Sequence, residues 1–135
     1  MKKLLSTKCS DTSFTIGTLL LRLAMGGLML PHGYSKLVKF ASLKNEFMNF
    51  MGMGSTLSLV LVIFAEFFCA ALIIGGLFTR LAAIPLVITM AVAVFKAHHS
   101  DIFGEAEHAS LYLMGYLAIL FLGPGKASLD RLLGK

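Results

Sequence analysis

The stretch FTIGTLLLRLAMGGLMLPHGYSK, residues 14–36, decides the fold of this chain. Residues 14–31 form an apolar run that only Arg22 interrupts, and the run ends at the polar residues of PHGYSK. A helix needs ~20 mainly apolar residues to cross a hydrocarbon core of ~30 Å. We therefore expect the run to form a transmembrane helix that leaves the hydrocarbon at PHGYSK.

Three further apolar tracts occupy much of the remaining chain. They cover residues 57–78, 81–95 and 109–122, and Glu66 is the charge that interrupts the first of them. Hydrophobic residues make up 57% of the 135 residues and charged residues 14%, whereas a soluble domain carries roughly 25% charged residues. This composition favours a membrane protein, because a small soluble domain could not bury so much apolar surface.

We predict an all-α fold, namely a membrane-spanning antiparallel four-helix bundle that forms a single domain over residues 1–135. The predicted spans are about 14–36, 55–78, 81–98 and 106–123. The last two apolar tracts are short, so they need flanking polar residues at the interface to reach across the membrane. Two spans with a re-entrant or buried hairpin form the alternative.

Basic residues predict the orientation, since cytoplasmic loops carry the excess of Lys and Arg. With four crossings, one side holds seven basic residues: Lys2, Lys3, Lys8, Arg80, Lys126, Arg131 and Lys135. The other side holds four: Lys36, Lys39, Lys44 and Lys96. Both termini are therefore expected in the cytoplasm. The net charge of +5 favours contact with anionic lipid headgroups over contact with nucleic acid. Most of the chain is assigned to membrane helices, so no soluble domain remains that could bind nucleic acid.

Two charged residues lie inside apolar tracts. Burying such a charge near the bilayer centre costs from a few to more than ~10 kcal/mol, so it normally finds a partner inside the protein. We predict an ion pair between Arg22 and Glu66 on adjacent antiparallel helices. The pair has two interpretations, which the sequence leaves open: it locks the register of the helices, or it lines a polar cavity for a redox or anionic ligand.

A second group of polar residues is expected at the outer rim of the bundle. Glu105, His108, Tyr112 and Tyr116 recur at spacings of three and four, which places them on one helix face. His32 and Lys36 reach the same level from the first helix. Such residues are common in the interfacial belt of membrane proteins, but histidines and carboxylates also exchange protons near neutral pH, as a quinol headgroup site requires.

Metal and thiol chemistry are less favoured. His32, His98, His99 and His108 share the outer side with Asp101, Glu105 and Glu107, yet their spacing matches no known zinc signature. We assign no metal site. Cys9 and Cys69 lie far apart and form neither a CxxC pair nor a disulfide framework. A redox role would therefore use something other than a protein dithiol.

Three segments resemble the DoxX/DoxD family of small bacterial membrane proteins: LLLRLAMGGLMLPHGYSKL, AEFFCAALIIGGLFTRLAAIPL and GEAEHASLYLMGYLAILFLGPGKASLD. The residues that match the polar pattern of this family are Arg22, His32, Gly33, Lys36, Glu66, Gly76, Thr79 and Arg80. The resemblance implies a four-helix bundle in the bacterial cytoplasmic (inner) membrane. It also implies membrane redox work, as in a quinone-reducing thiosulfate oxidoreductase subunit or a component assembled with superoxide-detoxifying and sulfur-transfer proteins.

We therefore predict a redox-associated membrane subunit that holds a quinone-type or other small ligand between its helices. The candidate ligand-binding residues are Arg22, His32, Lys36, Glu66, His108 and Tyr112. No catalytic residue is assigned, and quinone is the candidate cofactor. Expected partners are the lipid bilayer, redox or sulfur-handling proteins and further copies of the chain. A non-enzymatic scaffold that anchors other proteins is the alternative, and a small transporter or channel ranks third.

Overall fold

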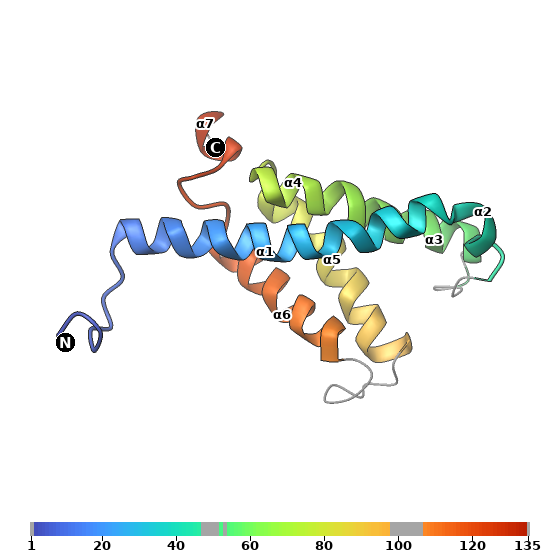
Figure 1. Ribbon diagram of the computed structural model, residues 1–135, viewed down its shortest axis with the longest axis horizontal. Helices are drawn as coiled ribbons and strands as arrows, with labels where there is room; N and C mark the ends of the chain where they lie inside the picture. The colour runs from blue at the N-terminus through green and yellow to red at the C-terminus, as the bar shows by residue number, and fades with distance from the viewer. Residues whose placement is uncertain (1, 47–51, 53, 98–106, 135) are drawn as a thin grey trace.

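The described residues fold mainly into helices, and no strand occurs among them (Figure 1). The computed structural model describes residues 2–46, 52, 54–97 and 107–134. In chain order, the helices are α1 (Asp11–Val38), α2 (Phe40–Leu43), α3 (Ser55–Ile63), η1 (Phe64–Cys69), α4 (Ala70–Gly75), α5 (Thr79–Val92), η2 (Ala93–Ala97), α6 (Glu107–Leu122) and α7 (Leu129–Leu132). Both η1 and η2 are π-helical. The prediction of an all-α chain is confirmed.

Among the residues that the structure describes, two helices are long and apolar enough to cross a membrane. They are α1 and the continuous helix Ser55–Gly75, which α3, η1 and α4 form together. The apolar helices Thr79–Phe95 and Glu107–Leu122 are shorter, and at ~1.5 Å per residue each covers about 25 Å. The first two predicted spans therefore have helices of sufficient length, whereas crossing by the other two stays a prediction.

Helix α1 packs along the helix Ser55–Gly75 through a stripe of buried residues. The buried residues of α1 are Thr18, Arg22, Gly26, Met29 and Gly33, whose spacings of three and four place them on one face. Thr18 lies beyond the end of α4 and contacts Gly125 instead. A Cβ atom at Gly26 would lie 2.8 Å from the carbonyl oxygen of Ala70. At Gly33 it would lie 2.6 Å from the carbonyl carbon of Glu66. These glycines therefore let the two antiparallel backbones approach closely, as small residues do in membrane helices.

Helices α5 and α6 run side by side and are inclined across α1 (Figure 1). The core lies where this pair meets α1 and α4. Tyr116 of α6 is fully buried there and donates a hydrogen bond of 2.9 Å to the carbonyl oxygen of Met25 on α1. Leu86 of α5 and Ile73 of α4 are also fully buried. One core therefore joins all of the longer helices.

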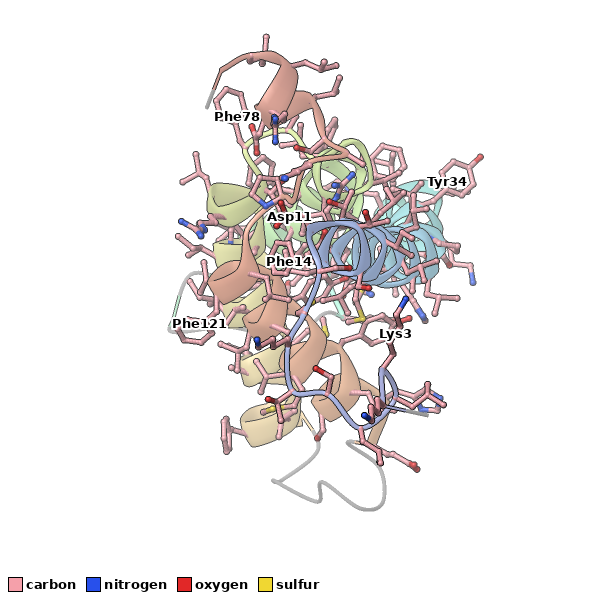
Figure 2. The ribbon with its side chains drawn as sticks, turned by 90° about the vertical axis from the view of Figure 1, so that its left-hand side faces the viewer. Lys3, Asp11, Phe14, Tyr34, Phe78 and Phe121 are labelled. Atoms are coloured by element: carbon pink, nitrogen blue, oxygen red, sulfur yellow. The ribbon has the colours of Figure 1, made fainter. Side chains whose placement is uncertain are left out.

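The outer surface of these helices is apolar. Leu28 on α1 is 63% exposed, Ile88 on α5 52% and Phe121 on α6 78%. Tyr34 and Phe121 point outward on different sides of the molecule (Figure 2). Helices that are apolar on both their packed and their exposed faces are typical of a chain surrounded by lipid.

Candidate functional site

Arg22 lies at the point where α4 ends, and its guanidinium is almost completely buried. Nε donates to the carbonyl oxygen of Ile73 at 3.1 Å, and Nη2 donates to that of Ile74 at 3.1 Å. Nη1 donates to the carbonyl oxygens of Pro124 at 2.6 Å and Ala127 at 2.7 Å. All three nitrogens of the guanidinium are therefore engaged by backbone. We call this arrangement the arginine clamp.

The clamp supplies hydrogen-bond donors to carbonyl groups at the end of α4; that of Ile74 has no other described donor, and that of Ile73 also accepts from the N–H of Gly76. The last carbonyl groups of a helix have no partner within the helix, and they favour a cation. Gly76 ends α4 with a φ of +71°, a conformation that favours glycine, and a Cβ there would lie 2.9 Å from Cζ of Arg22. The guanidinium therefore joins α1, the end of α4 and the segment after α6.

The predicted ion pair between Arg22 and Glu66 is wrong. Arg22 lies level with the end of α4, about two helical turns beyond Glu66, and its donors are used by carbonyl oxygens. The sequence places charges along helices but does not show which backbone carbonyls lack a partner. Glu66 forms its ion pair with Lys36 instead.

Asp130 completes the same end of the molecule and was not singled out as a site residue by sequence reasoning. Its carboxylate oxygens accept hydrogen bonds from the backbone N–H groups of Phe78 at 2.8 Å and Thr79 at 3.0 Å. Its own N–H donates to the carbonyl oxygen of Gly76 at 2.9 Å. Asp130 therefore caps the start of α5. The sequence contained one sign of this role, an acidic residue soon after the GPG turn. It gave no sign of the partner, because Thr79 lies 51 residues away in sequence.

A second polar site lies further along α1. Nζ of Lys36 is 2.5 Å from Oε2 of Glu66, with 26% of the lysine side chain and 7% of the glutamate side chain exposed. Glu66 belongs to the π-helical turn η1, and such turns occur frequently at functional sites. Gly33 lies against the backbone of Glu66 and Phe67, which brings α1 close enough for Lys36 to reach the carboxylate.

Aromatic side chains border this ion pair. The ring of His32 meets that of Tyr112 edge to face at 6.1 Å, and Tyr112 stacks on Tyr116 at 6.1 Å. His32 lies one helical turn before Lys36 on α1, which brings these rings near the ion pair. We call His32, Lys36, Glu66 and Tyr112 together the Lys36–Glu66 site. It draws residues from α1, η1 and α6.

The Lys36–Glu66 site has unused hydrogen-bonding capacity. An ammonium group carries three donors and a carboxylate about four acceptor sites. Within the described residues, Lys36 and Glu66 form one hydrogen bond with each other and no further ones, and the hydroxyl of Tyr112 forms none. The hydroxyl of Tyr116, by contrast, is taken by Met25. The site could therefore donate to and accept from a small polar group.

The structure brings together four of the six predicted ligand-binding residues: His32, Lys36, Glu66 and Tyr112. Arg22 belongs to the separate arginine clamp. His108 is exposed on α6, one turn before Tyr112. His98, His99, Asp101 and Glu105 lie outside the described residues. No group of three or more His, Cys, Asp or Glu side chains suited to a metal ion occurs in the part of the chain that the structure describes. Ligand binding by the four residues stays a prediction.

Comparison with known proteins identifies the family to which this sequence belongs. The model of the DoxX family matches residues 17–99, a region that includes Arg22, Lys36 and Glu66. Inner membrane protein YqjF of Escherichia coli (strain K12) is 29% identical over 126 residues, which cover 89% of this chain and 94% of that protein. Uncharacterized membrane protein Rv3486 of Mycobacterium tuberculosis (strain H37Rv) is 34% identical over 84 residues, or 52% of each chain. No solved structure matches significantly.

Proposed function

The chain belongs to the DoxX family of membrane proteins, and from this premise we propose that it is a multi-pass inner-membrane subunit whose Lys36–Glu66 site binds a quinone headgroup. Its relative YqjF is named as an inner membrane protein. In this proposal the chain supplies the binding site and exchanges protons, while a partner redox protein supplies or accepts the electrons.

The proposed topology has four crossings with both termini in the cytoplasm. The end of α4, the start of α5 and the segment after α6 meet around Arg22 and Asp130. Helix ends that meet in this way lie on one side of the membrane, as alternating crossings require. The larger group of basic residues belongs to this side, which supports its placement in the cytoplasm.

One observation carries the proposed function: a nearly buried ion pair with spare donors and acceptors lies between mainly apolar helices. Ionisable groups inside membrane segments usually mark ligand or proton pathways. Lys36 and Tyr112 could donate hydrogen bonds to quinone carbonyl oxygens, and Glu66 could accept from the hydroxyl of a hydroquinone. His32 is exposed on the outer surface of α1, so a quinone could approach from the bilayer.

Tyrosine fluorescence provides a direct test. The chain has three tyrosines and no tryptophan, and Tyr112 belongs to the Lys36–Glu66 site while Tyr116 stacks on it. A Tyr34→Phe background leaves these two as the emitters. Titration of the purified protein in detergent with a short-chain ubiquinone should quench them saturably. Organic extracts of the purified protein should also contain quinone.

A double variant separates ligand binding from folding. Replacing a buried ion pair by apolar residues of similar volume is often neutral for stability, so Lys36→Met with Glu66→Met should fold. We expect its quinone affinity to fall roughly tenfold or more, as the loss of charge-assisted hydrogen bonds predicts. Lys39→Met, at an exposed position just beyond α1, is the matched control and should bind normally. A double variant that folds and binds quinone like the wild type would refute the proposal.

A non-enzymatic scaffold is the second candidate, and the arginine clamp supports it. Arg22 and Asp130 both use their polar atoms to hold backbone. Several polar residues of the family pattern would then serve folding alone. A scaffold would retain its protein partners in the Lys36→Met, Glu66→Met double variant and would yield no quinone on extraction.

A further inference from the structure

The segment after α6 displays apolar side chains on its outside. Leu132 is 80% exposed, Leu133 60% and Leu129 44%. Arg22 and Asp130 hold this segment against the end of α4, so the leucines project from a fixed position. Apolar side chains held at the ends of membrane helices can enter the boundary between headgroups and acyl chains.

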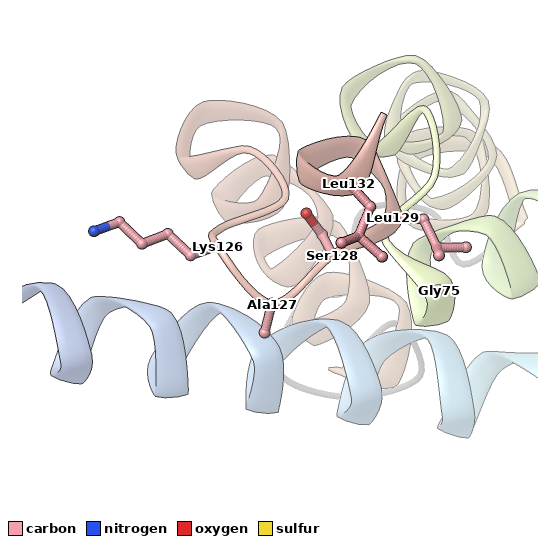
Figure 3. Close-up of a pocket in the computed structure, with 6 residues that line it drawn as sticks. All are labelled: Gly75, Lys126, Ala127, Ser128, Leu129 and Leu132. Carbon is pink, nitrogen blue, oxygen red and sulfur yellow. The ribbon is translucent and has the colours of Figure 1, made fainter. Parts of the chain in front are cut away.

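A largely open cavity of about 380 Å³ lies at the surface between this segment and the end of α4 (Figure 3). Its lining residues are Gly75, Lys126, Ala127, Ser128, Leu129 and Leu132. The two leucine side chains gather on the side of Gly75, whereas Lys126 extends away from them over α1 (Figure 3). The cavity therefore combines an apolar wall with a cation at its rim. It does not include the Lys36–Glu66 site.

Lys126 holds its present partner only weakly. Its Nζ lies 3.1 Å from the carboxylate of Asp11, and the side chains are 50% and 89% exposed. An ion pair this exposed contributes little, because water screens both charges and two long side chains must be ordered. Lys126 could therefore exchange Asp11 for another anion.

Other charges at this end favour an anionic ligand. Arg80 lies against Gly123, where a Cβ would be 3.1 Å from its Nε, and Arg131 is exposed on α7. Asp130 is buried, and its carboxylate is engaged by the start of α5. The accessible charged residues at this end are therefore mainly basic, with Arg80, Lys126 and Arg131 against Asp11.

We propose that this cavity binds an anionic phospholipid, with the phosphate at Lys126 and an acyl chain along Leu129 and Leu132. The inference rests on the proposed placement of this end in the cytoplasmic leaflet, but it is independent of quinone binding. Basic residues near a membrane surface attract anionic lipids by roughly a factor of five each. The apolar wall distinguishes this site from a site for free phosphate.

Native mass spectrometry of the full chain in detergent tests the proposal. The protein is titrated with phosphatidylglycerol or phosphatidylcholine of the same acyl chains. We expect preferential retention of phosphatidylglycerol, a loss of about fivefold in Lys126→Ala, and a gain in Asp11→Asn, which frees Lys126. Leu132→Ser should weaken retention of both lipids. Lys39→Ala, beyond the opposite end of α1, is the matched control and should change nothing.

Three results would overturn the proposal. Equal retention of the two lipids would remove the role of charge. An equal effect of Lys126→Ala and Lys39→Ala would indicate unspecific contact with the surrounding lipid. Displacement of phosphatidylglycerol by the same concentration of glycerol 3-phosphate would assign the site to a soluble phosphate compound. Each readout is made without quinone, so failure here leaves the quinone titration to be judged separately.

Discussion

Arg22 and Lys36 are cations on one side of α1, about four turns apart, yet their surroundings differ in kind. Arg22 gives hydrogen bonds to four backbone carbonyl oxygens and has no carboxylate partner within hydrogen-bonding distance among the described residues. Lys36 faces a single carboxylate, and its side chain keeps 26% exposure. The first cation is saturated by the fold, whereas the second retains capacity for another group.

This difference indicates how to tell structural from functional charges in a membrane protein. A saturated charge that joins segments far apart in sequence, as Arg22 joins α4 to residues beyond α6, is expected to matter for folding. A charge pair with spare donors and acceptors is expected to matter for binding. Substitutions at the two sites should therefore change different measurements.

The largest loss of stability is expected from Arg22→Leu. This change leaves the carbonyl oxygens of Ile74, Pro124 and Ala127 without their donor, whereas that of Ile73 keeps the N–H of Gly76. Hydrogen bonds to charged groups contribute about 1.5–3 kcal/mol each, so the combined loss should be on the order of 5 kcal/mol. We expect little folded protein in the membrane, measured by size-exclusion chromatography of detergent extracts. Arg22→Lys keeps the charge but lacks the planar guanidinium with its several donors, so it should restore only part of the folded protein. Normal accumulation of Arg22→Leu would contradict the structural role of the clamp.

The next effect separates single from double variants at the Lys36–Glu66 site. Removing one member of a buried pair strands the other charge and destabilises by about 3–5 kcal/mol, and the partial exposure of Lys36 favours the lower end. Lys36→Met should therefore lower the melting temperature more than the double variant with Glu66→Met. A fluorescence-based thermal unfolding scan in detergent measures both. Equal melting temperatures for the single variant and the wild type would show that the pair contributes nothing to stability.

Sequence reasoning reached the α-helical class, the first two membrane-crossing lengths and most of the residues around Lys36, because apolar runs and helical spacing are local signals. It did not predict the hydrogen-bond partners of the charged side chains. Arg22 was matched to Glu66 because both are charged, whereas the fold offers Arg22 carbonyl groups at the end of α4 and in the turn after α6. Every residue has a backbone carbonyl group, so the sequence does not show which of these groups will accept a hydrogen bond from Arg22. The capping role of Asp130 was missed for the same reason, since the groups that it caps are backbone N–H groups.

A smaller effect is expected at Asp130, which belongs to the saturated region. Asp130→Ala removes the acceptors for the N–H groups of Phe78 and Thr79, and loss of a helix cap costs about 0.5–2 kcal/mol. Asp130→Asn keeps one carbonyl oxygen and should recover about half of the loss. The melting temperature reports both, and amide hydrogen exchange at the start of α5 should increase in the alanine variant. Unchanged exchange there would place the stabilising role of Asp130 elsewhere.

The smallest changes in stability are expected from substitutions of two neighbouring tyrosines, Tyr112 and Tyr116. These substitutions also give the most direct comparison between a saturated and an unsaturated polar group. Tyr116→Phe removes a hydrogen bond to Met25, and such bonds between membrane helices contribute roughly 1 kcal/mol. Tyr112→Phe removes a hydroxyl that has no hydrogen-bond partner among residues 2–46, 54–97 and 107–134, so its melting temperature should stay unchanged. For quinone the order reverses, because only the Tyr112 hydroxyl is free to donate to a ligand. Short-chain ubiquinone should thus bind Tyr112→Phe more weakly and Tyr116→Phe almost normally. If both variants lose stability and neither loses affinity, the distinction between a saturated and an unsaturated site fails, and Tyr112 belongs to the packing of α6 alone.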